Sequence, residues 1–330
     1  MIDPQPIVEL IYAFRRSKTM FAAVALGVFD RLQGGPAGVG SFAGLNASAV
    51  ERLLDGCVSL GLLDKDDGGM YRNTPLAERY LCRSSPETLA GYVLYSNAAL
   101  FPMWAHLEDA IREGTNRWEP AFGFPAGGIF DHFFNTTEAR RDFLLGMHGF
   151  GRLSSPRVVR AFDLSRFARM VDLGGGTGHL AMAAMDAYPG MSAAVFDLPA
   201  AIEFAREFAD GRIQLIEGDF FRDPLPAADL YAVGRILHDW TEAKIHRLLA
   251  KIHAALPAGG GLLIAEILLD DDKRGPVDAQ MQSLNMLVCT EGRERSLAEY
   301  QRVLEAAGFA DIEGRRTGAP LDAVLAIKSR

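Results

Sequence analysis

A glycine-rich turn between an apolar strand and a helix is the feature that most constrains the fold of this 330-residue chain. The segment Val171–His179 reads VDLGGGTGH. Glycine permits a tight turn and lets a ligand approach the backbone closely, so this pattern predicts a binding site at the end of a strand. The glycine spacing is G-x-G-x-G. A nicotinamide fingerprint needs a glycine where His179 stands, which disfavours a nicotinamide oxidoreductase.

Strands and helices alternate after residue 165. Strands are expected at 169–173, 192–196, 213–217, 229–233 and 261–267, with helices at 179–188, 200–208, 241–256 and 299–307. This alternation predicts a doubly wound, Rossmann-like parallel sheet covered by helices on both faces. Two final strands, at 311–316 and 323–327, are joined by a turn too short for a parallel crossover, so they are expected to pair antiparallel. Such an α/β sheet with an antiparallel C-terminal hairpin is the class I methyltransferase arrangement, predicted over residues 161–330.

The first third of the chain has helical periodicity instead. Apolar residues recur at helical spacing over 7–14 and 19–32, and Asn46 with the Ser48-x-x-Glu51 capping box predicts another helix, which ends near Gly61. A charged Gly-Gly turn follows within 62–74 and predicts a hairpin. Helices followed by a hairpin are typical of a winged helix. We therefore expect a mainly helical, winged-helix-like dimerisation domain over 1–105 and a helical linker that contributes to a substrate pocket over 106–160.

A winged helix is also a common DNA-binding module, so a DNA-binding regulator is an alternative from another class. Residues 1–105 hold nearly equal numbers of acids and bases, and the helix that would read DNA exposes Glu51 and Asp55. Phosphate neutralisation needs Lys and Arg, and the net charge of the chain is −8. The sequence therefore favours dimerisation and predicts no nucleic-acid partner.

Three well-separated cysteines without metal-type spacing argue against a disulfide framework or a zinc site. The longest apolar runs span about ten residues, whereas a membrane helix needs roughly 20. The N-terminus has acidic residues early and basic residues late, which is the reverse of a signal peptide. We expect a cytoplasmic protein without a membrane partner.

Acidic and aromatic residues follow the second and third predicted strands. Asp197, in the segment FDLP with Leu198, is placed to accept hydrogen bonds from ribose hydroxyls. The third strand leads into Gly218-Asp219-Phe220-Phe221, where a carboxylate could accept from an adenine amino group and an aromatic ring could stack on the base. Because the carboxyl ends of parallel strands meet at one edge of a sheet, these residues and the glycine turn are predicted to form one nucleoside site.

A histidine follows the fourth predicted strand, in the segment GRILHDW at 234–240. Histidine exchanges protons near neutral pH, which suits His238 to act as a general base. A phenolic hydroxyl has a pKa of about 10, so removing its proton makes it a stronger nucleophile. A base must itself be oriented by an acceptor, and Glu266 and Glu294 are the candidates.

Aromatic residues are frequent over 86–160. Most are expected to be core. The segment 139–161, however, leads directly into the glycine turn and carries Phe143, Met147 and Phe150 at helical spacing. A helix there could line a pocket that faces the nucleoside site.

These residues resemble the plant-type small-molecule O-methyltransferases, and within them the acetylserotonin (hydroxyindole) O-methyltransferases. The resemblance covers nearly the whole chain and includes DLGGGTG, EGDFFRDPLPAADLY, RILHDW, the SLNMLV segment and TGAPLDA. It implies a homodimer and S-adenosylmethionine as the cofactor, with His238 as proton acceptor steadied by Glu266 and Glu294. The implied cofactor contacts are Asp197, Asp219, Phe220 and Arg235, and the implied substrate contacts are Asp239 and Asn285. We expect six more residues of the same strand ends to bind the cofactor: Gly174, Gly175, Gly176, Leu198, Gly218 and Phe221. Phe143, Met147 and Met286 are expected to contact the substrate, and no metal is expected.

The sequence departs from this family at a few positions. The acetylserotonin enzymes have a tyrosine at Phe134 and a tryptophan at Gly151, which contact the cofactor there, and a glutamine at the substrate-contacting position of Cys289. Plant enzymes place a lysine at Gly234, whereas the charge here is on Arg235.

The sequence thus predicts an S-adenosylmethionine-dependent O-methyltransferase that acts on a hydroxyl of a small aromatic molecule by in-line methyl transfer. The alternative within the same fold is a natural-product tailoring enzyme that binds the cofactor but acts at carbon or nitrogen, or without methyl transfer.

Overall fold

The computed structural model describes residues 2–124, 130 and 136–329. The chain divides into two compact units, Met1–Phe101 and Pro102–Arg330. The finer division into three parts at 105 and 160 stays a prediction. Among the described residues, no helix is both long and apolar enough to cross a membrane.

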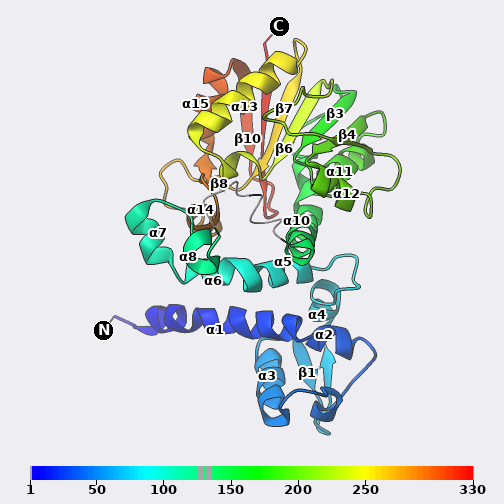
Figure 1. Ribbon diagram of the computed structural model, residues 1–330, viewed down its shortest axis with the longest axis vertical. Helices are drawn as coiled ribbons and strands as arrows, with labels where there is room; N and C mark the ends of the chain where they lie inside the picture. The colour runs from blue at the N-terminus through cyan, green and yellow to red at the C-terminus, as the bar shows by residue number, and fades with distance from the viewer. Residues whose placement is uncertain (1, 125–129, 131–135, 330) are drawn as a thin grey trace. The chain divides into compact units, whose positions relative to one another are not determined.

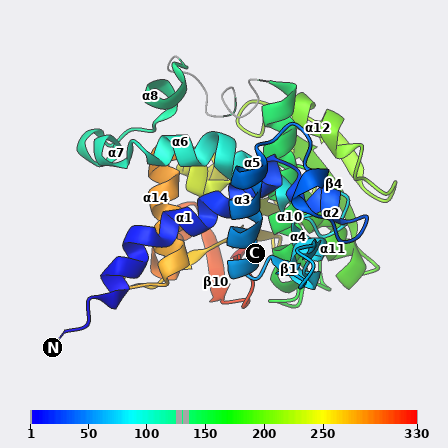
Figure 2. The same ribbon diagram turned by 90° about the horizontal axis from the view of Figure 1, so that it is seen from below.

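The first unit is mainly helical and has its own apolar core. Its elements are α1 (Gln5–Ala25), α2 (Val28–Leu32), η1 (Val39–Ser41), α3 (Ala47–Ser59), β1 (Leu63–Lys65), β2 (Tyr71–Asn73), α4 (Pro75–Tyr80), α5 (Ala90–Tyr95) and η2 (Ser96–Leu100). The predicted hairpin is confirmed, because β1 and β2 pair antiparallel. Helix α1 packs against α2, α3 and α5, as Figure 2 shows for α3 and α5. The core contains Phe29, Leu54 and Tyr71.

The structure refines the helix bounds of this unit. Helical spacing was predicted over 7–14 and 19–32, and α1 runs without a break from Gln5 through Ala25, across the residues between them. The residues between these segments do not include glycine or proline, whereas Gly27 (φ 68°) interrupts the helix before α2. Helix α3 is capped by Asn46, whose side chain accepts from the Ala49 amide, so Ser48 lies inside the first turn and not at the cap.

The second unit is built on a seven-stranded sheet (Figure 1). Its strands are β3 (Arg169–Leu173), β4 (Ser192–Asp197), β5 (Gln214–Glu217), β6 (Leu230–Gly234), β7 (Gly261–Glu266), β10 (Phe309–Arg315) and β11 (Asp322–Lys328), in the order β10-β11-β7-β6-β3-β4-β5. Strand β11 is antiparallel to both neighbours, and the pairs among β3 to β7 are parallel. The predicted doubly wound sheet with an antiparallel C-terminal hairpin is confirmed.

Helices cover both faces of this sheet. The helices of this part of the chain are α6 (Phe101–Trp104), α7 (Leu107–Glu113), α8 (Trp118–Phe122), α10 (Thr137–Val158), α11 (His179–Ala187), α12 (Pro199–Ala205), η3 (Leu237–Asp239), α13 (Glu242–Ala255), α14 (Val277–Cys289) and α15 (Leu297–Ala306). The short strands β8 (Leu268–Leu269) and β9 (Arg295–Ser296) pair with each other outside the seven-stranded sheet. In the sheet, β4 and β5 lie on one side of β3, and β6 and β7 lie on the other. Right-handed crossovers therefore place α11 and α12 on one face and α13 on the other.

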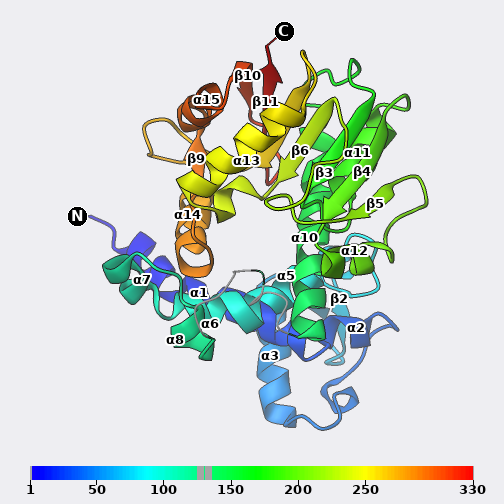
Figure 3. The same ribbon diagram turned by 45° about the horizontal axis from the view of Figure 1, so that its top comes forward.

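The register of the parallel strands positions the site. Leu173 lies opposite Phe196, Asp197 opposite Glu217, and Gly234 opposite Ala265. The carboxyl ends of β3 to β7 therefore share one edge of the sheet. Helix α10 packs against α11 and α12, which Figure 3 shows, and so brings the aromatic-rich segment to that edge.

Candidate active site

A cavity opens at the carboxyl ends of the parallel strands. It is lined by the glycine turn, the ends of β4, β5 and β6, the segment around η3 and one face of α10. All ten residues predicted to bind the cofactor lie in its wall: Gly174, Gly175, Gly176, Asp197, Leu198, Gly218, Asp219, Phe220, Phe221 and Arg235. The structure thus brings these residues together, and their individual binding roles stay predictions.

Two glycines of this cavity lie so close to neighbouring side chains that no larger residue would fit at their positions. A Cβ atom on Gly174 would lie 2.5 Å from Ile236 Cδ1, and one on Gly218 would lie 2.3 Å from Phe196 Cζ. Gly174 and Gly176 also have φ angles of 68° and 54°, in the left-handed region that favours glycine. Gly174, Gly175 and Gly176 line the cavity, so the turn presents its backbone to a ligand bound there.

Asp197 at the end of β4 is held by two backbone amides. Its Oδ2 accepts from the Gly176 amide at 2.8 Å, and its Oδ1 accepts from the Leu198 amide at 2.7 Å. Burial raises the pKa of this carboxyl to about 6, against the opposing effect of the two amides. Asp197 lines the cavity, which suits the predicted hydrogen bonds from ribose hydroxyls.

The segment after β5 contributes an acid and two aromatic rings that meet edge to face. Asp219 Oδ1 accepts from the Phe221 amide at 2.8 Å, which fixes the carboxylate beside the cavity. The ring centroids of Phe220 and Phe221 are 4.8 Å apart, and Phe221 contacts Trp240 at 5.1 Å. An acceptor beside an aromatic platform fits an adenine ring.

Arg235 has an unusual backbone and an incompletely satisfied side chain. Its φ of 57° is rare for a non-glycine residue. The guanidinium lies 5.1 Å from the centroid of the Phe150 ring, and its Nη1 donates to Met147 Sδ at 3.8 Å. Its Nε is buried, and no described residue accepts a hydrogen bond from it. A cationic group with a spare donor in the cavity wall suits an anionic part of a ligand.

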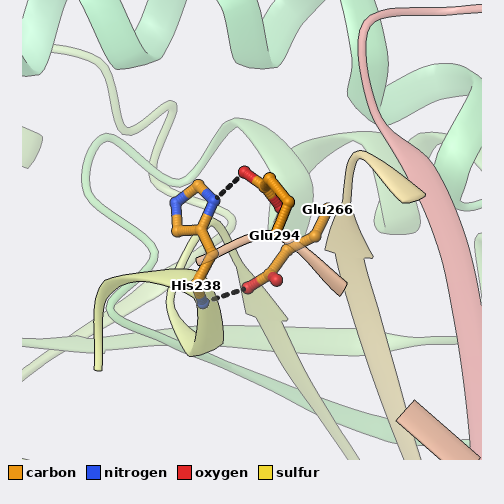
Figure 4. A group of neighbouring side chains, drawn as sticks. All are labelled: His238, Glu266 and Glu294. Carbon is orange, nitrogen blue, oxygen red and sulfur yellow. Dashed lines mark hydrogen bonds and ion pairs between the residues drawn. The ribbon is translucent and has the colours of Figure 1, made fainter. Parts of the chain in front are cut away.

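The imidazole of His238, in η3, is bonded to Glu294 (Figure 4). The distance from Nδ1 to Glu294 Oε1 is 2.6 Å, and Glu294 is completely buried. The carboxylate fixes the ring and leaves Nε2 as the nitrogen available to another partner, with Asp239 Oδ1 3.6 Å away. This is the geometry of a base oriented by an acceptor.

Glu266, at the end of β7, reaches His238 through the backbone and not through the ring. Its Oε1 accepts from the amides of Ile236, Leu237 and His238 at 3.2, 2.7 and 3.1 Å. Its Oε2 accepts from the Tyr300 hydroxyl. Glu266 is therefore a positioning residue that shapes η3, whereas Glu294 acts directly on the imidazole.

Burial and three carboxylates set the protonation of His238. Burial disfavours the imidazolium, but the charges of Glu294, Glu266 and Asp239 outweigh it and raise the pKa of His238 to about 9. Burial also raises the pKa of Asp239 to about 7, although His238 opposes that shift. The site thus holds a proton near neutral pH when nothing else is bound.

Ligand-type atoms of His238, Glu266 and Glu294 all lie within 4.8 Å of one another, the spacing of a metal site. The hydrogen bonds above already engage both oxygens of Glu266, the Nδ1 of His238 and one oxygen of Glu294. A metal would have to displace these bonds. The donor set therefore fits a hydrogen-bonded unit better than a cation, and a reaction without metal stays the prediction.

One face of α10 forms a wall of the cavity, as expected from the aromatic segment. The lining residues of this helix are Phe143, Leu144, Met147, Gly151, Ser154, Ser155 and Val158. They recur every three or four positions, which is the helical period. Of the five residues predicted to contact the substrate, Phe143, Met147 and Asp239 line the cavity.

The other two implied substrate residues, Asn285 and Met286, are buried in α14 outside the cavity wall. The Oδ1 atom of Asn285 accepts from Trp104 Nε1 at 2.8 Å, an interaction that the sequence did not reveal. The Cys289 thiol donates to the Asn285 carbonyl at 2.9 Å, and burial raises its pKa. Asn285, Met286 and Cys289 therefore lie together in α14, but they do not line the cavity.

The departure at Gly151 has a structural counterpart that sequence reasoning missed. A Cβ atom on Gly151 would lie 2.3 Å from Cε1 and Nε2 of His179, so the imidazole occupies the space of any side chain there. His179 lines the cavity, yet the sequence singled it out only as the residue that breaks a dinucleotide fingerprint. Phe134, the other cofactor-side departure, lies outside the described residues.

An open α/β sheet with a glycine cradle, an acid at the end of the next strand and a ligand cavity at the switch in strand order defines a class I methyltransferase. Two family models match this chain: the O-methyltransferase domain over residues 104–310 and the O-methyltransferase dimerisation domain over 8–83. The chain belongs to this family and is an S-adenosylmethionine-dependent O-methyltransferase.

Similar proteins support the assignment over the full length. Bovine (Bos taurus) acetylserotonin O-methyltransferase is 46% identical, covering 97% of this chain and 96% of the relative. The crystal structure of human N-acetylserotonin methyltransferase, in complex with S-adenosylmethionine, superposes with a TM-score of 0.95 at 41% identity, covering 99% of this chain and 97% of that one. PigF with S-adenosylhomocysteine gives 0.88 at 31% identity, covering 99% and 100%. The match of the first unit to a dimerisation domain favours dimerisation over the DNA-binding alternative.

Proposed function

We propose that this enzyme methylates the hydroxyl of a small, flat aromatic molecule, with His238 accepting the hydroxyl proton. The observation that carries the proposal is the 2.6 Å hydrogen bond between His238 Nδ1 and buried Glu294, next in sequence to Asp239 and Trp240, which line the cavity. Phe143, Met147 and Trp240 supply part of these walls and suit a planar ring.

In this proposal, one set of residues binds and orients the reactants, and His238 with Glu294 handles the proton. When bound, S-adenosylmethionine supplies the methyl group on a positively charged sulfur. Asp197 and the glycine turn would hold the nucleoside, and the cavity walls would orient the aromatic ring with its hydroxyl toward the methyl group. Holding both reactants in this geometry accounts for much of the rate gain. His238 takes the hydroxyl proton on Nε2, and Glu294 stabilises the imidazolium that forms.

The raised pKa of His238 is compatible with the role of a base when the positive charge of the cofactor is taken into account. A base must be unprotonated, yet the surrounding carboxylates favour the imidazolium in the empty cavity. His238 loses its proton more readily when a cationic ligand lies nearby, because like charges repel. Cofactor binding would thereby prepare the base.

Replacement of Glu294 by Gln is expected to shift the pH profile. The unprotonated imidazole is the active form, so kcat/KM rises with pH through the pKa of His238. Removing the Glu294 charge lowers that pKa, and the acidic limb of the profile moves to lower pH. The exposed Glu291→Gln removes a carboxylate from the same loop without touching His238 and should leave the limb in place. An acidic limb that does not move in Glu294→Gln contradicts the role of Glu294.

The substrate class is tested with methyl-labelled cofactor and a panel of hydroxylated phenols, quinolines and indoles, acetylserotonin among them. The relatives named above make a hydroxyindole the first candidate. Cys289, which stands where those enzymes have a glutamine, argues for a substrate that needs no amide contact there. We expect label in an O-methyl ether. Label only in N-methyl or C-methyl products would favour the tailoring alternative.

We also propose that the enzyme is a homodimer assembled through the first unit. Helix α1 exposes Ile7, Leu10, Ile11 and Phe14, with Leu10 72% exposed. An apolar face of this size on a dimerisation domain suits a second copy of the chain.

Leu10→Asp combined with Ile11→Asp is expected to yield a monomer by light scattering, whereas the wild type gives twice the chain mass. A charge buried at an apolar interface is costly, so two of them per chain should prevent assembly. Glu9→Gln on the same helix is the control and should remain dimeric. A monomeric wild type would contradict the proposal.

A further inference from the structure

Two residues from different helices fit together at one end of the cavity. Gly151, in α10, lies directly under the imidazole of His179, the first residue of α11. The approach is so close that a Cβ on Gly151 would lie 2.3 Å from the ring. Because Gly151 has no side chain, the imidazole of His179 can occupy this position at the end of the cavity.

His179 is anchored on one side and free on the other. Its Nδ1 is 2.9 Å from Ser155 Oγ, and no described residue bonds to its Nε2. The side chain is half-buried and lines the cavity beside Arg235 and Met147. Burial, together with the charge of Arg235 and the nearby His148, lowers the pKa of His179 to about 3. The ring is therefore neutral and can offer one hydrogen-bond donor without bringing a charge.

The position of His179 identifies which part of a ligand it meets. The ends of β4 and β5 are occupied by the groups suited to ribose and adenine. His179 lies at the other end of the glycine turn, where Arg235 presents a buried Nε that has no acceptor among the described residues. A cationic donor and a neutral ring thus both line this part of the cavity, where the amino-acid end of the cofactor would lie.

We propose that His179 binds the carboxylate of the amino-acid end of S-adenosylmethionine through Nε2–H, alongside Arg235. In this arrangement the Ser155 hydroxyl, 2.9 Å from Nδ1, would donate to that nitrogen and leave the ring hydrogen on Nε2. Gly151 keeps the space that the ring requires. This inference rests on the proposed placement of the nucleoside at Asp197 and Asp219.

The test is calorimetric titration of His179→Ala with two ligands. S-adenosylhomocysteine carries the amino-acid end, and 5′-methylthioadenosine lacks it. A hydrogen bond to a charged group is lost only with the first ligand, so we expect affinity for S-adenosylhomocysteine to fall about tenfold or more. Affinity for methylthioadenosine should stay within about twofold. The exposed His246→Ala, in α13, is the matched control and should bind both ligands like the wild type.

Gly151→Ala tests the steric half of the inference. The added methyl must displace the imidazole, so this variant should lose affinity for S-adenosylhomocysteine as His179→Ala does. In the double variant the ring is absent, and Gly151→Ala should then cost nothing further. This non-additivity is specific to a direct clash.

The inference is overturned if His179→Ala binds S-adenosylhomocysteine like the wild type, or if it weakens both ligands equally, which would indicate a structural role. A wild-type enzyme that binds neither ligand would instead overturn the placement of the nucleoside. The two failures are thus distinguishable.

Discussion

His238→Ala is expected to lower kcat by at least about 100-fold while affinity for S-adenosylhomocysteine stays near the wild-type value. General-base catalysis contributes about 10²–10⁴-fold, and the imidazole is not part of the cavity wall that the implied cofactor contacts form. Steady-state kinetics with the hydroxyl substrate and calorimetry with the demethylated cofactor measure the two quantities.

His238→Gln is the matched variant for this prediction. A glutamine amide can still donate to Glu294, which limits the cost of leaving that buried carboxylate without its partner. It cannot accept a proton near neutral pH. We expect the same loss of kcat with a melting temperature closer to the wild type. Unchanged turnover in either folded variant would remove His238 from the role of base.

Glu266→Ala is expected to reduce the free energy of unfolding by about 3 kcal/mol or more, because each buried donor left without an acceptor costs about 1–3 kcal/mol. Four donors lose their acceptor in this variant: three backbone amides at 236–238 and the Tyr300 hydroxyl. Urea denaturation followed by circular dichroism gives the free energy.

Two further variants separate the contributions at Glu266. Glu266→Gln keeps an oxygen for the three amides and should be markedly more stable than Glu266→Ala. Tyr300→Phe removes only the hydroxyl contact and should cost less than Glu266→Ala. An alanine variant as stable as the wild type would show that Glu266 does not hold η3.

Much of the fold follows from local patterns. The apolar strand before Gly174, the glycines and the apolar helix after His179 are adjacent in sequence, so the strand–turn–helix unit was predictable. The parallel topology then requires the residues after β4 and β5 to meet it at one edge of the sheet. The cofactor side of the site was therefore accessible from the sequence.

Contacts between distant segments were not accessible in the same way. Nothing in the sequence shows that Glu266 bonds to three amides and Glu294 to the ring, because both are acids near strand ends and differ only in their tertiary placement. The bond between Trp104 and Asn285 joins residues 181 positions apart and has no local signal. The fit of His179 against Gly151 likewise depends on how α10 packs on α11.

The most direct test of this account is a crystal structure of the enzyme with S-adenosylhomocysteine and the best hydroxylated ligand from the screen. We expect the ligand oxygen to lie between the sulfur and Nε2 of His238, within hydrogen-bonding distance of that nitrogen. A ligand hydroxyl on the far side of the cavity, or an imidazole turned away from it, would contradict the proposed chemistry.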